Sequence, residues 1–585
     1  MNRIFSRNIL AALPWIGAVT AIVLIQGCEM ARAAGDQDPN VSAFKYREVF
    51  LPEGIGDSAE ALGLNTLEED WGIWGHNLGK VVPEHHSQNI YAKQNGSTLK
   101  KQFCFSSNHL YEYIEEYIDS KYDEDEKIRF AIVPNDNDIV CICEKCVAVG
   151  NTRRNASPAA EHLVRRLAKR FPNHIFYTSD YRTTRSVPKD TMPSNTGVLV
   201  SAMNYPIAYG ATPEEGRFMQ RLQAWSETTP RILVWDYINN FDDYFTPYPS
   251  FGAFQRRLNN YKNNHVTAVF LNGSGPDISA MSRLRTEVLA ELTANPGIDW
   301  KETLKAKANE IYPVSGNVIA QFMIDQEQFA ADNGTPLPLY VGVDSAKKIY
   351  LPAERFKEFH DELLKLRGRT SGQERAELDL LLGQLALTRL ELKRMKGSLK
   401  NSDKYLTDLH YLVNKGHESY SESGWSVDSY IRDFKFLLDH FNQVGGSNKL
   451  KGVQLMALTP LDPDYTDISI LTDGVLGIPS NYHSGNLIVS PENMTQIGIP
   501  IVPGMKKVRV WLSYNPAYRI VLPETVTLTN KGKVIGKVSP TYPENGHGHE
   551  PVEFDLPGGL DGSLTLTLYK QPETHSMAID EIEAF

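Results

Sequence analysis

Residues 197–237, GVLVSAMNYPIAYGATPEEGRFMQRLQAWSETTPRILVWDY, decide the fold because they contain a strand, a helix and a second strand in that order. The first and last runs are short, apolar and rich in β-branched residues, which is typical of strands buried on both faces. Between them, Thr212-Pro213-Glu214-Glu215 is a capping box with proline in the first turn, and Phe218, Leu222 and Trp225 follow at helical spacing. The stretch therefore predicts one βαβ unit of a parallel sheet.

The same alternation extends in both directions from this unit. It predicts eight strands, at 46–51, 71–74, 101–105, 128–133, 174–178, 197–203, 231–237 and 266–271. Eight strands with intervening helices over residues 44–300 have the size of one (β/α)8 barrel of the TIM type. Leucines at helical spacing predict a helical domain over 301–446, and short alternating strands predict a β-sandwich over 447–585. The expected fold class is thus α/β, followed by a helical region and a sandwich.

Composition excludes several classes of protein. Of the 585 residues, 41% are hydrophobic and 22% are charged, as in ordinary globular proteins. The net charge of −11 argues against a nucleic-acid-binding protein, which needs a basic face.

The N-terminus predicts export. Arg3 and Arg7 precede an apolar run over 9–25, so residues 1–34 form a signal peptide pattern. Cys28 ends a lipobox-like sequence and is favoured as a lipidation site, Ala31-Arg32-Ala33 offers ordinary cleavage, and an uncleaved anchor is the third alternative. The expected location is the periplasm or the surface of a bacterium, with membrane contact only through a lipid anchor.

Strand ends give the candidate chemistry, because functional groups of such barrels follow the C-terminal ends of the strands. Asp136 and Asp236 lie at the ends of two predicted strands and form the expected catalytic carboxylate pair, one handling the proton and the other acting as base or nucleophile. Asp180, Glu48 and Asp242-Asp243 are weaker rivals for these roles. The expected substrate contacts also follow strands: Trp74, His76, Asn135, Asp180, Tyr181, Tyr205, Tyr237, Asn240 and Asn272. Trp235 is a further candidate aromatic contact, with the alternative that it points into the helix layer because it alternates with Asp236.

Four cysteines lie near the same end of the predicted barrel. Cys141, Cys143 and Cys146 form C-x-C-x-x-C, and Cys104 ends the third predicted strand. Four thiolates can build a structural zinc site, whereas an exported protein could instead form two disulfides. Spacing leaves both alternatives open, and either would hold the loop that carries Asp136.

Several of these segments together resemble a known family. The carrying residues are 102–107, Pro134-Asn135-Asp136, the cysteine triplet and Val234-Trp235-Asp236-Tyr237 with Asn240-Phe241. They resemble the bacterial family called domain of unknown function 4838, over about residues 45–330. The resemblance implies a (β/α)8 barrel similar to glycoside hydrolases of the α-glucuronidase and β-hexosaminidase type, exported for polysaccharide degradation. The chain departs from the family layout in lacking a small α/β domain before the barrel.

The C-terminal region resembles galactose-binding-like modules. Leu471-Thr472-Asp473-Gly474 and Ile579-Asp580-Glu581-Ile582 carry this resemblance, which implies glycan binding and a structural Ca²⁺. A packing domain that binds nothing is the alternative. Together these features predict an exported glycoside hydrolase that needs no cofactor for catalysis and acts on a complex, uronate-containing polysaccharide or oligosaccharide. A non-catalytic surface glycan-binding protein and a structural partner in polysaccharide uptake are the rival functions.

Overall fold

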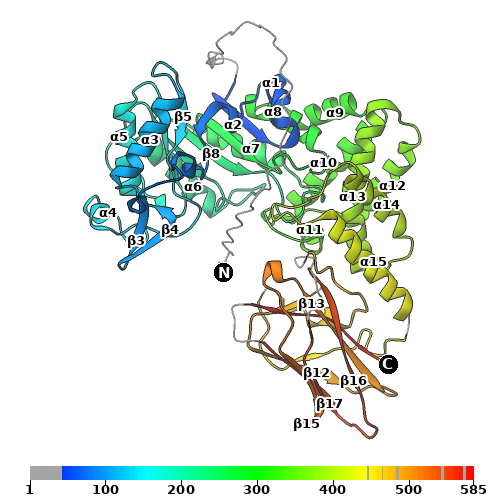
Figure 1. Ribbon diagram of the computed structural model, residues 1–585. Coiled ribbons are helices and arrows are strands. Elements are labelled where there is room, and N and C mark those ends of the chain that lie inside the picture. Colours follow the sequence, from blue (N-terminus) through cyan, green and yellow to red (C-terminus); the bar gives the residue numbers. More distant parts are fainter. Residues whose placement is uncertain (1–41, 445–446, 464, 482–486, 542–545, 571–574) are drawn as a thin grey trace, which may run out of the picture.

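The computed structural model describes residues 42–585 except 445–446, 464, 482–486, 542–545 and 571–574 (Figure 1). The expected signal peptide over 1–34 and Cys28 lie outside the described residues. Within the described part of the chain, no helix has the length and apolarity needed to cross a bilayer. Three regions follow one another along the chain: an α/β domain, a helical region and antiparallel β-sheets.

The α/β domain is built on a curled, half-barrel sheet of seven strands that all run parallel. Its spatial order is β1 (Tyr46–Phe50), β9 (Ala268–Asn272), β8 (Ile232–Tyr237), β7 (Thr196–Ser201), β6 (Ile175–Asp180), β5 (Arg129–Ala131) and β2 (Trp71–Ile73). Among the described residues, β1 and β2 have no strand between them, so the sheet does not close.

The prediction of a closed eight-stranded barrel is therefore wrong: the sheet is open and contains seven of the eight predicted strands. The segment 101–105 does not enter the sheet but belongs to a hairpin of β3 (Tyr91–Gln94) and β4 (Ser97–Phe103). Asn95 and Gly96 have φ of 50° and 80°, the conformation of a two-residue hairpin turn. Lys100 and Lys101 are exposed, whereas a strand inside a parallel sheet would bury them.

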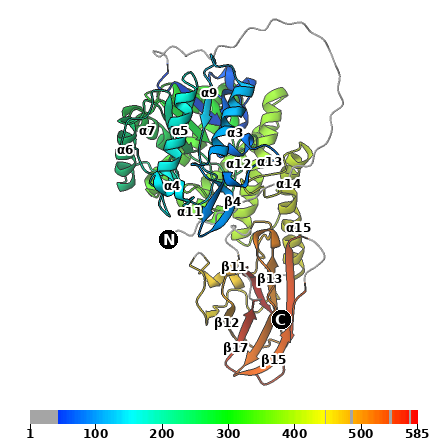
Figure 2. The same ribbon diagram turned by 60° about the vertical axis from the view of Figure 1, so that its left-hand side comes forward.

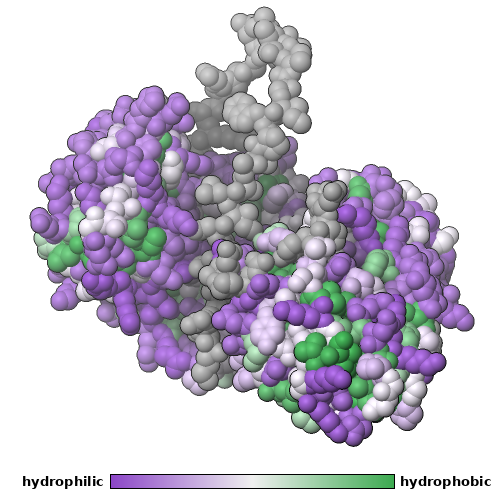
Figure 3. Space-filling view, turned by 60° about the horizontal axis from the view of Figure 1, so that its bottom comes forward, coloured by the Kyte–Doolittle hydropathy of each residue, from purple (hydrophilic) through white to green (hydrophobic). Residues whose placement is uncertain are grey.

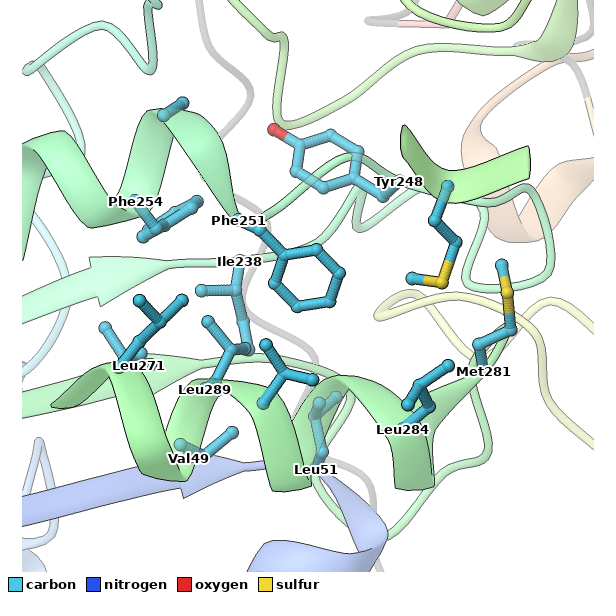
Figure 4. Close-up of a cluster of buried hydrophobic side chains, with 14 of the residues drawn as sticks. Val49, Leu51, Ile238, Tyr248, Phe251, Phe254, Leu271, Met281, Leu284 and Leu289 are labelled. Atoms are coloured by element: carbon cyan, nitrogen blue, oxygen red, sulfur yellow. The ribbon is translucent and has the colours of Figure 1, made fainter. Parts of the chain in front are cut away.

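Helices cover the outer face of the sheet, as the βαβ pattern requires. They are α1 (Asp57–Ala61), α3 (Asn108–Lys121), α5 (Ser157–Arg170), α6 (Pro213–Ser226), α7 (Gly252–Asn263) and α8 (Ser282–Ala294). Two short helices, α2 (Leu67–Asp70) and α4 (Glu144–Ala148), lie in the connections between strands. Val49 and Leu271 from the strands contact Phe254 and Leu289 from α7 and α8 in one buried cluster (Figure 4). The capping prediction for α6 is confirmed, since the Thr212 side chain accepts a hydrogen bond from the Glu215 backbone.

The inner face of the sheet has its own core, and strand alternation decides which side chains reach it. Trp71, Tyr177, Leu233 and Phe270 are among the buried residues of this inner cluster. In β8, Leu233 and Trp235 point inward, whereas Val234 belongs to the outer cluster. Trp235 therefore lies on the inner face of the sheet, and the alternative that it points into the helix layer is wrong.

The helical region continues the outer layer. Its helices are α9 (Trp300–Ile311), α10 (Gly316–Asn333), α11 (Val343–Ile349), α12 (Ala353–Arg367), α13 (Gly372–Met395), α14 (Asp403–Asn414) and α15 (Val427–Val444). Phe322, Phe359 and Leu382 share one buried cluster with the strands. Figure 2 shows α12 and α13 beside the α/β domain. The region is thus continuous with the α/β domain, and its loops reach the end of the sheet.

The C-terminal region contains two antiparallel sheets that share one apolar core. One contains β10 (Met456–Ala457), β12 (Met494–Pro500), β17 (Ser563–Tyr569), β14 (Thr525–Asn530) and β15 (Lys533–Val538). The other contains β11 (Ile488–Ser490), β18 (Met577–Ala584), β13 (Lys507–Tyr514) and β16 (Gly548–Asp555). Figure 3 shows a mainly hydrophilic face with small apolar patches.

Candidate active site

The C-terminal ends of the parallel strands form the edge of the sheet that faces the helical region; we call it the mouth. Pairing register brings Phe50, Tyr237 and Asn272 into one layer at this edge. One layer below, the rings of Trp235 and Phe270 lie 4.2 Å apart. Phe50, Trp74, Trp235 and Met203 are only half-buried, so they leave apolar surface at the mouth. Such surface is what the C–H face of a sugar ring can stack on.

Asp136 lies at this mouth, on the loop after β5. Its carboxylate is exposed and forms an ion pair of 3.1 Å with Arg182, which also binds Asp138 at 2.7 Å. Asn135 and Asn137 fix the loop by donating side-chain hydrogen bonds to the backbone carbonyl of Lys101, at 3.0 and 2.9 Å. The loop contacts and the ion pair together hold the Asp136 carboxylate in place at the mouth.

His76 and Tyr181 lie beside the same loop. The His76 Nδ1 donates to the Pro134 carbonyl at 2.5 Å, and the His76 and Tyr181 ring centroids are 5.8 Å apart. Asp136 is close enough to Tyr181 to contribute, after burial, to raising the pKa of that phenol. The structure thus brings His76, Asn135, Asp136 and Tyr181 together, in agreement with the positions expected from the strand ends.

Asp236, by contrast, does not face the mouth. It alternates with the inward-facing Trp235 and Tyr237, so its side chain enters the helix layer. There it is fully buried, and it accepts hydrogen bonds from Arg257 at 2.6 and 2.8 Å and from Tyr261 at 2.5 Å. The expectation that Asp136 and Asp236 converge in one cavity is wrong, and Asp236 instead fixes α7 to β8.

We therefore expect Asp236→Asn to act on stability. The substitution leaves the buried Arg257 charge without its carboxylate, which should cost about 3–5 kcal/mol. Asp138→Asn is the matched control, because its pair with Arg182 is exposed and should cost about 0–1 kcal/mol. Urea unfolding of both variants measures the difference. A stable Asp236→Asn variant that lost only glycan turnover would contradict this assignment.

Other expected contacts also have structural partners away from the mouth. Asp180 is buried, with Arg221 at 3.0 Å and the Trp225 indole at 2.6 Å. Tyr205 is buried beneath the Arg257 guanidinium, which lies 3.9 Å from its ring centroid.

Two further residues from the sequence prediction are tied to neighbouring backbone. The Asn240 amide bonds the backbone of Val341, donating at 2.8 Å and accepting at 3.1 Å. Asp243 accepts hydrogen bonds from the Phe245 and Thr246 backbone N–H groups.

Glu48 is buried inside the sheet beside the N-terminal ends of the strands. Its Oε2 accepts hydrogen bonds from the Tyr46 hydroxyl at 3.2 Å and the Leu67 backbone at 2.7 Å. Burial raises the pKa of Glu48 to about 8. These bonds connect β1 to the start of α2, so Glu48 has a structural role at the open edge of the sheet.

A carboxylate that the sequence prediction missed reaches the mouth from the helical region. Glu422 lies on the loop between α14 and α15, and its backbone N–H donates to the Phe241 carbonyl at 2.9 Å, just after β8. Its Oε2 accepts a hydrogen bond from the Tyr340 hydroxyl at 2.8 Å. Phe241 in turn contacts both Tyr237 and Tyr340, with ring centroids 5.9 and 5.7 Å away. The loop therefore places Glu422 over the aromatic edge of β8.

The environment of Glu422 favours its protonated form. Burial of the carboxylate among protein atoms is the largest cause that raises its pKa, and the negative charges of Asp242 and Asp136 raise it further. The Tyr340 hydrogen bond opposes this shift. The residue as a whole is nevertheless solvent-exposed, so substrate can reach it. One carboxylate with a raised pKa near another that is ion-paired is the division of roles that acid–base catalysis needs.

The four cysteines of the sequence prediction form one cluster. Their sulfur atoms all lie within 4.8 Å of one another, with Cys104 at 3.7 Å from Cys143 and 3.6 Å from Cys146. Four sulfurs placed tetrahedrally about Zn²⁺ at ~2.3 Å are ~3.8 Å apart, so the cluster fits this metal. All four cysteines are unbridged in this structure, which fits the metal alternative.

Neighbouring groups also suit a thiolate cluster. Hydrogen bonds from Cys104 and Cys146 lower the pKa of the Cys141 thiol, and the Lys93 backbone N–H donates to its sulfur at 3.2 Å. A zinc ion held by Cys104, Cys141, Cys143 and Cys146 would join the hairpin to the loop after β5.

Acidic residues of the two expected calcium motifs lie close together in the C-terminal region. Burial raises the pKa of Asp473 to about 6. Burial is also the main cause that raises the pKa of Glu581, and the charges of Asp473 and Asp580 raise it further. Glu581 Oε2 has no hydrogen-bond partner within the structure described. These residues suit a cation, and calcium there stays a prediction.

The α/β domain matches a known protein family. Residues 42–324 match the family described as Domain of unknown function (DUF4838). The search of curated proteins gives no significant match. One similar solved structure is a GH138 enzyme targeting pectin rhamnogalacturonan II, with 8% identity and a TM-score of 0.29 over 81% of this chain and 77% of that chain. A Streptococcus pneumoniae β-galactosidase is similar at 14% identity and a TM-score of 0.17, over 24% of this chain and 94% of that chain. A chitosan-binding module of a Paenibacillus chitosanase/glucanase is similar at 13% identity and a TM-score of 0.17, over 24% of this chain and 98% of that chain. At these values the likenesses carry no argument about activity.

Proposed function

We propose that this protein, whose residues 42–324 form a DUF4838 domain, is a glycoside hydrolase with its active site at the mouth of the sheet. The observation that carries the proposal is that two carboxyl groups reach the mouth: Glu422, hydrogen-bonded to Tyr340 beside the end of β8, and the exposed, Arg182-bound Asp136. Half-buried aromatic rings beside them supply a surface for a sugar ring.

The two carboxyl groups have different roles in this proposal. Glu422, protonated, gives its proton to the glycosidic oxygen as the C–O bond breaks and the sugar becomes oxocarbenium-like. Asp136, ionised, stabilises the positive charge that develops and acts either as nucleophile or as base for water. Where Asp136 is the nucleophile, water then cleaves the glycosyl–Asp136 bond and gives its proton to Glu422; where Asp136 is the base, it takes the proton of the attacking water, and exchange with solvent moves that proton off Asp136 and reprotonates Glu422. In both cases the hydroxyl of water forms the new reducing end. The reaction needs no cofactor, because both proton and charge are handled by side chains.

The cellular setting of the proposal comes from the sequence alone. Residues 1–34 support export, with Cys28 as a lipid anchor in the periplasm or on the surface of a bacterium. A complex polysaccharide, with uronate-bearing chains among the candidates, is the substrate class that fits an exported enzyme of this kind. The C-terminal sheets would then hold glycan near the mouth.

A panel of neutral and uronate-bearing polysaccharides tests the function. We expect the purified protein to release reducing oligosaccharides from at least one of them, and to lose this activity in Asp136→Asn. Asp138→Asn, which removes the other partner of Arg182, should retain it. Tight binding to a polymer with no release of product would favour the rival function of a glycan-binding protein and contradict the enzyme.

A further inference from the structure

The hairpin and the cysteine triplet together carry an unusual charge. We call residues 91–104 and 139–156 the cysteine module. It contains six Lys and Arg residues and one acidic residue, a net charge of +5 in a chain of net charge −11. The basic residues are Lys93, Lys100, Lys101, Lys145, Arg153 and Arg154. Even with Zn²⁺ bound by four thiolates, which adds −2, the module stays at +3.

The module is one structural unit. Lys93 accepts a backbone hydrogen bond from Ile142 at 2.9 Å, and the Gln94 amide donates to the Val140 carbonyl at 2.8 Å. Arg153 donates to the Asn95 side chain in the hairpin turn at 3.1 Å. β3, β4 and α4 accordingly lie side by side in Figure 1.

Its positive charges are available to a ligand. All six basic residues are exposed, and none forms an ion pair within the part of the chain that the structure describes. Lys93 and Arg153 bind only the neutral side chains of Asn89 and Asn95. By comparison, Arg170 on α5 forms ion pairs with Glu115 and Asp119.

The module also adjoins the mouth. The Lys101 carbonyl accepts hydrogen bonds from Asn135 and Asn137, which flank Asp136. Gln102 donates to the Asn135 carbonyl and to the Asn137 side chain, at 3.1 and 3.2 Å. A polymer chain that occupies the mouth beside Asp136 can therefore continue over the module.

We propose that the cysteine module is a docking surface for a carboxylated polysaccharide chain, separate from the groups that cleave it. Charge complementarity carries this assignment, because an anionic polymer is repelled by the rest of the chain and attracted by the module. The inference rests on the proposed function for the identity of the polymer as a glycan. It extends that function by selecting polyuronates over neutral chains.

The test measures binding and not turnover, so that it is independent of the proposed chemistry. The variant replaces Lys93, Lys100, Arg153 and Arg154 by Gln, leaving Lys101 beside the Asp136 loop unchanged. The matched control removes four exposed lysines from the helical region: Lys348, Lys365, Lys400 and Lys435. Both variants lose four positive charges, and full-length protein is titrated with polygalacturonate by calorimetry at low and physiological salt.

We expect the module variant to bind polygalacturonate at least about tenfold more weakly, or about 1.4 kcal/mol, spread over four exposed contacts. The control variant should bind like the wild type, and raising the salt should weaken wild-type binding. Neutral dextran should not bind the module. Equal affinity in the two variants, or equal affinity for duplex DNA and polygalacturonate, would overturn the proposal.

Failure of the proposed function would look different. Wild-type protein that binds polygalacturonate through the module but cleaves no glycan would overturn the hydrolase and leave the docking surface intact.

Discussion

Glu422→Gln is expected to lower kcat/KM on the best polysaccharide by about 10²- to 10⁴-fold, the contribution of a positioned general acid. Glutamine keeps the size of the side chain and can still accept the Tyr340 hydrogen bond, but it has no proton to give. Because Glu422 is exposed, the variant should fold like the wild type. Glu418→Gln, on the same loop and also exposed, is the control that should retain activity.

The pH profile separates a proton donor from a residue that only binds substrate. The reaction needs Glu422 protonated, and its raised pKa keeps the proton in place at higher pH than an ordinary glutamate would. Wild-type activity should therefore fall as the pH rises through that pKa, and Glu422→Gln should lose this alkaline limb. The loss in kcat/KM should also shrink on aryl glycosides whose leaving group needs no proton. A variant that lost activity equally on every leaving group, with an unchanged profile, would contradict the role.

Local sequence pattern was sufficient for most of the sheet. Seven of the predicted strand segments lie in it, because each is an apolar run bounded by turns and helices. The eighth was misplaced, although Asn95-Gly96 is a strong hairpin signal and Lys100-Lys101 are poor residues for a buried strand. Local chemistry could have corrected that prediction.

The candidate site was predictable only where it is local. Asp136 could be found because its loop directly follows a strand, whereas the choice of Asp236 needed the inward or outward phase of β8. Neighbouring side chains of a strand point to opposite faces, and the sequence must show which of them face the helices. In β8 both faces carry apolar residues, so the sequence alone does not show on which face Asp236 lies. Glu422 joins the mouth through Tyr340, 82 positions earlier in the chain, and through Phe241. Such long-range packing has no periodic signal, although the Ser- and Gly-rich loop ending in Trp425 marked an interruption between two helices.

Purified protein is expected to contain about one zinc ion per chain, and Cys141→Ser is expected to lose it. Structural zinc contributes directly to folding free energy, so losing it should destabilise the α/β domain by more than about 4 kcal/mol. For a domain of this size that corresponds to a fall in Tm of roughly 10 °C. Elemental analysis and thermal melting measure the two effects. Ser106→Ala is the matched control, since it removes a contact of 3.3 Å to Cys146 but leaves all four sulfurs.

Loss of the metal should also reach the mouth. Gln102 lies on β4, two residues before Cys104. Its side chain holds the Asp136 loop through hydrogen bonds to Asn135 and Asn137. Freeing the hairpin should therefore lower kcat on the polysaccharide more than it raises KM, because Asp136 is mispositioned while the aromatic edge of β8 remains. Re-adding zinc to chelator-treated wild type should restore both Tm and kcat. Four titratable thiols in fresh protein that holds no metal, with a Tm unchanged by chelator, would show that the cluster packs as thiols alone.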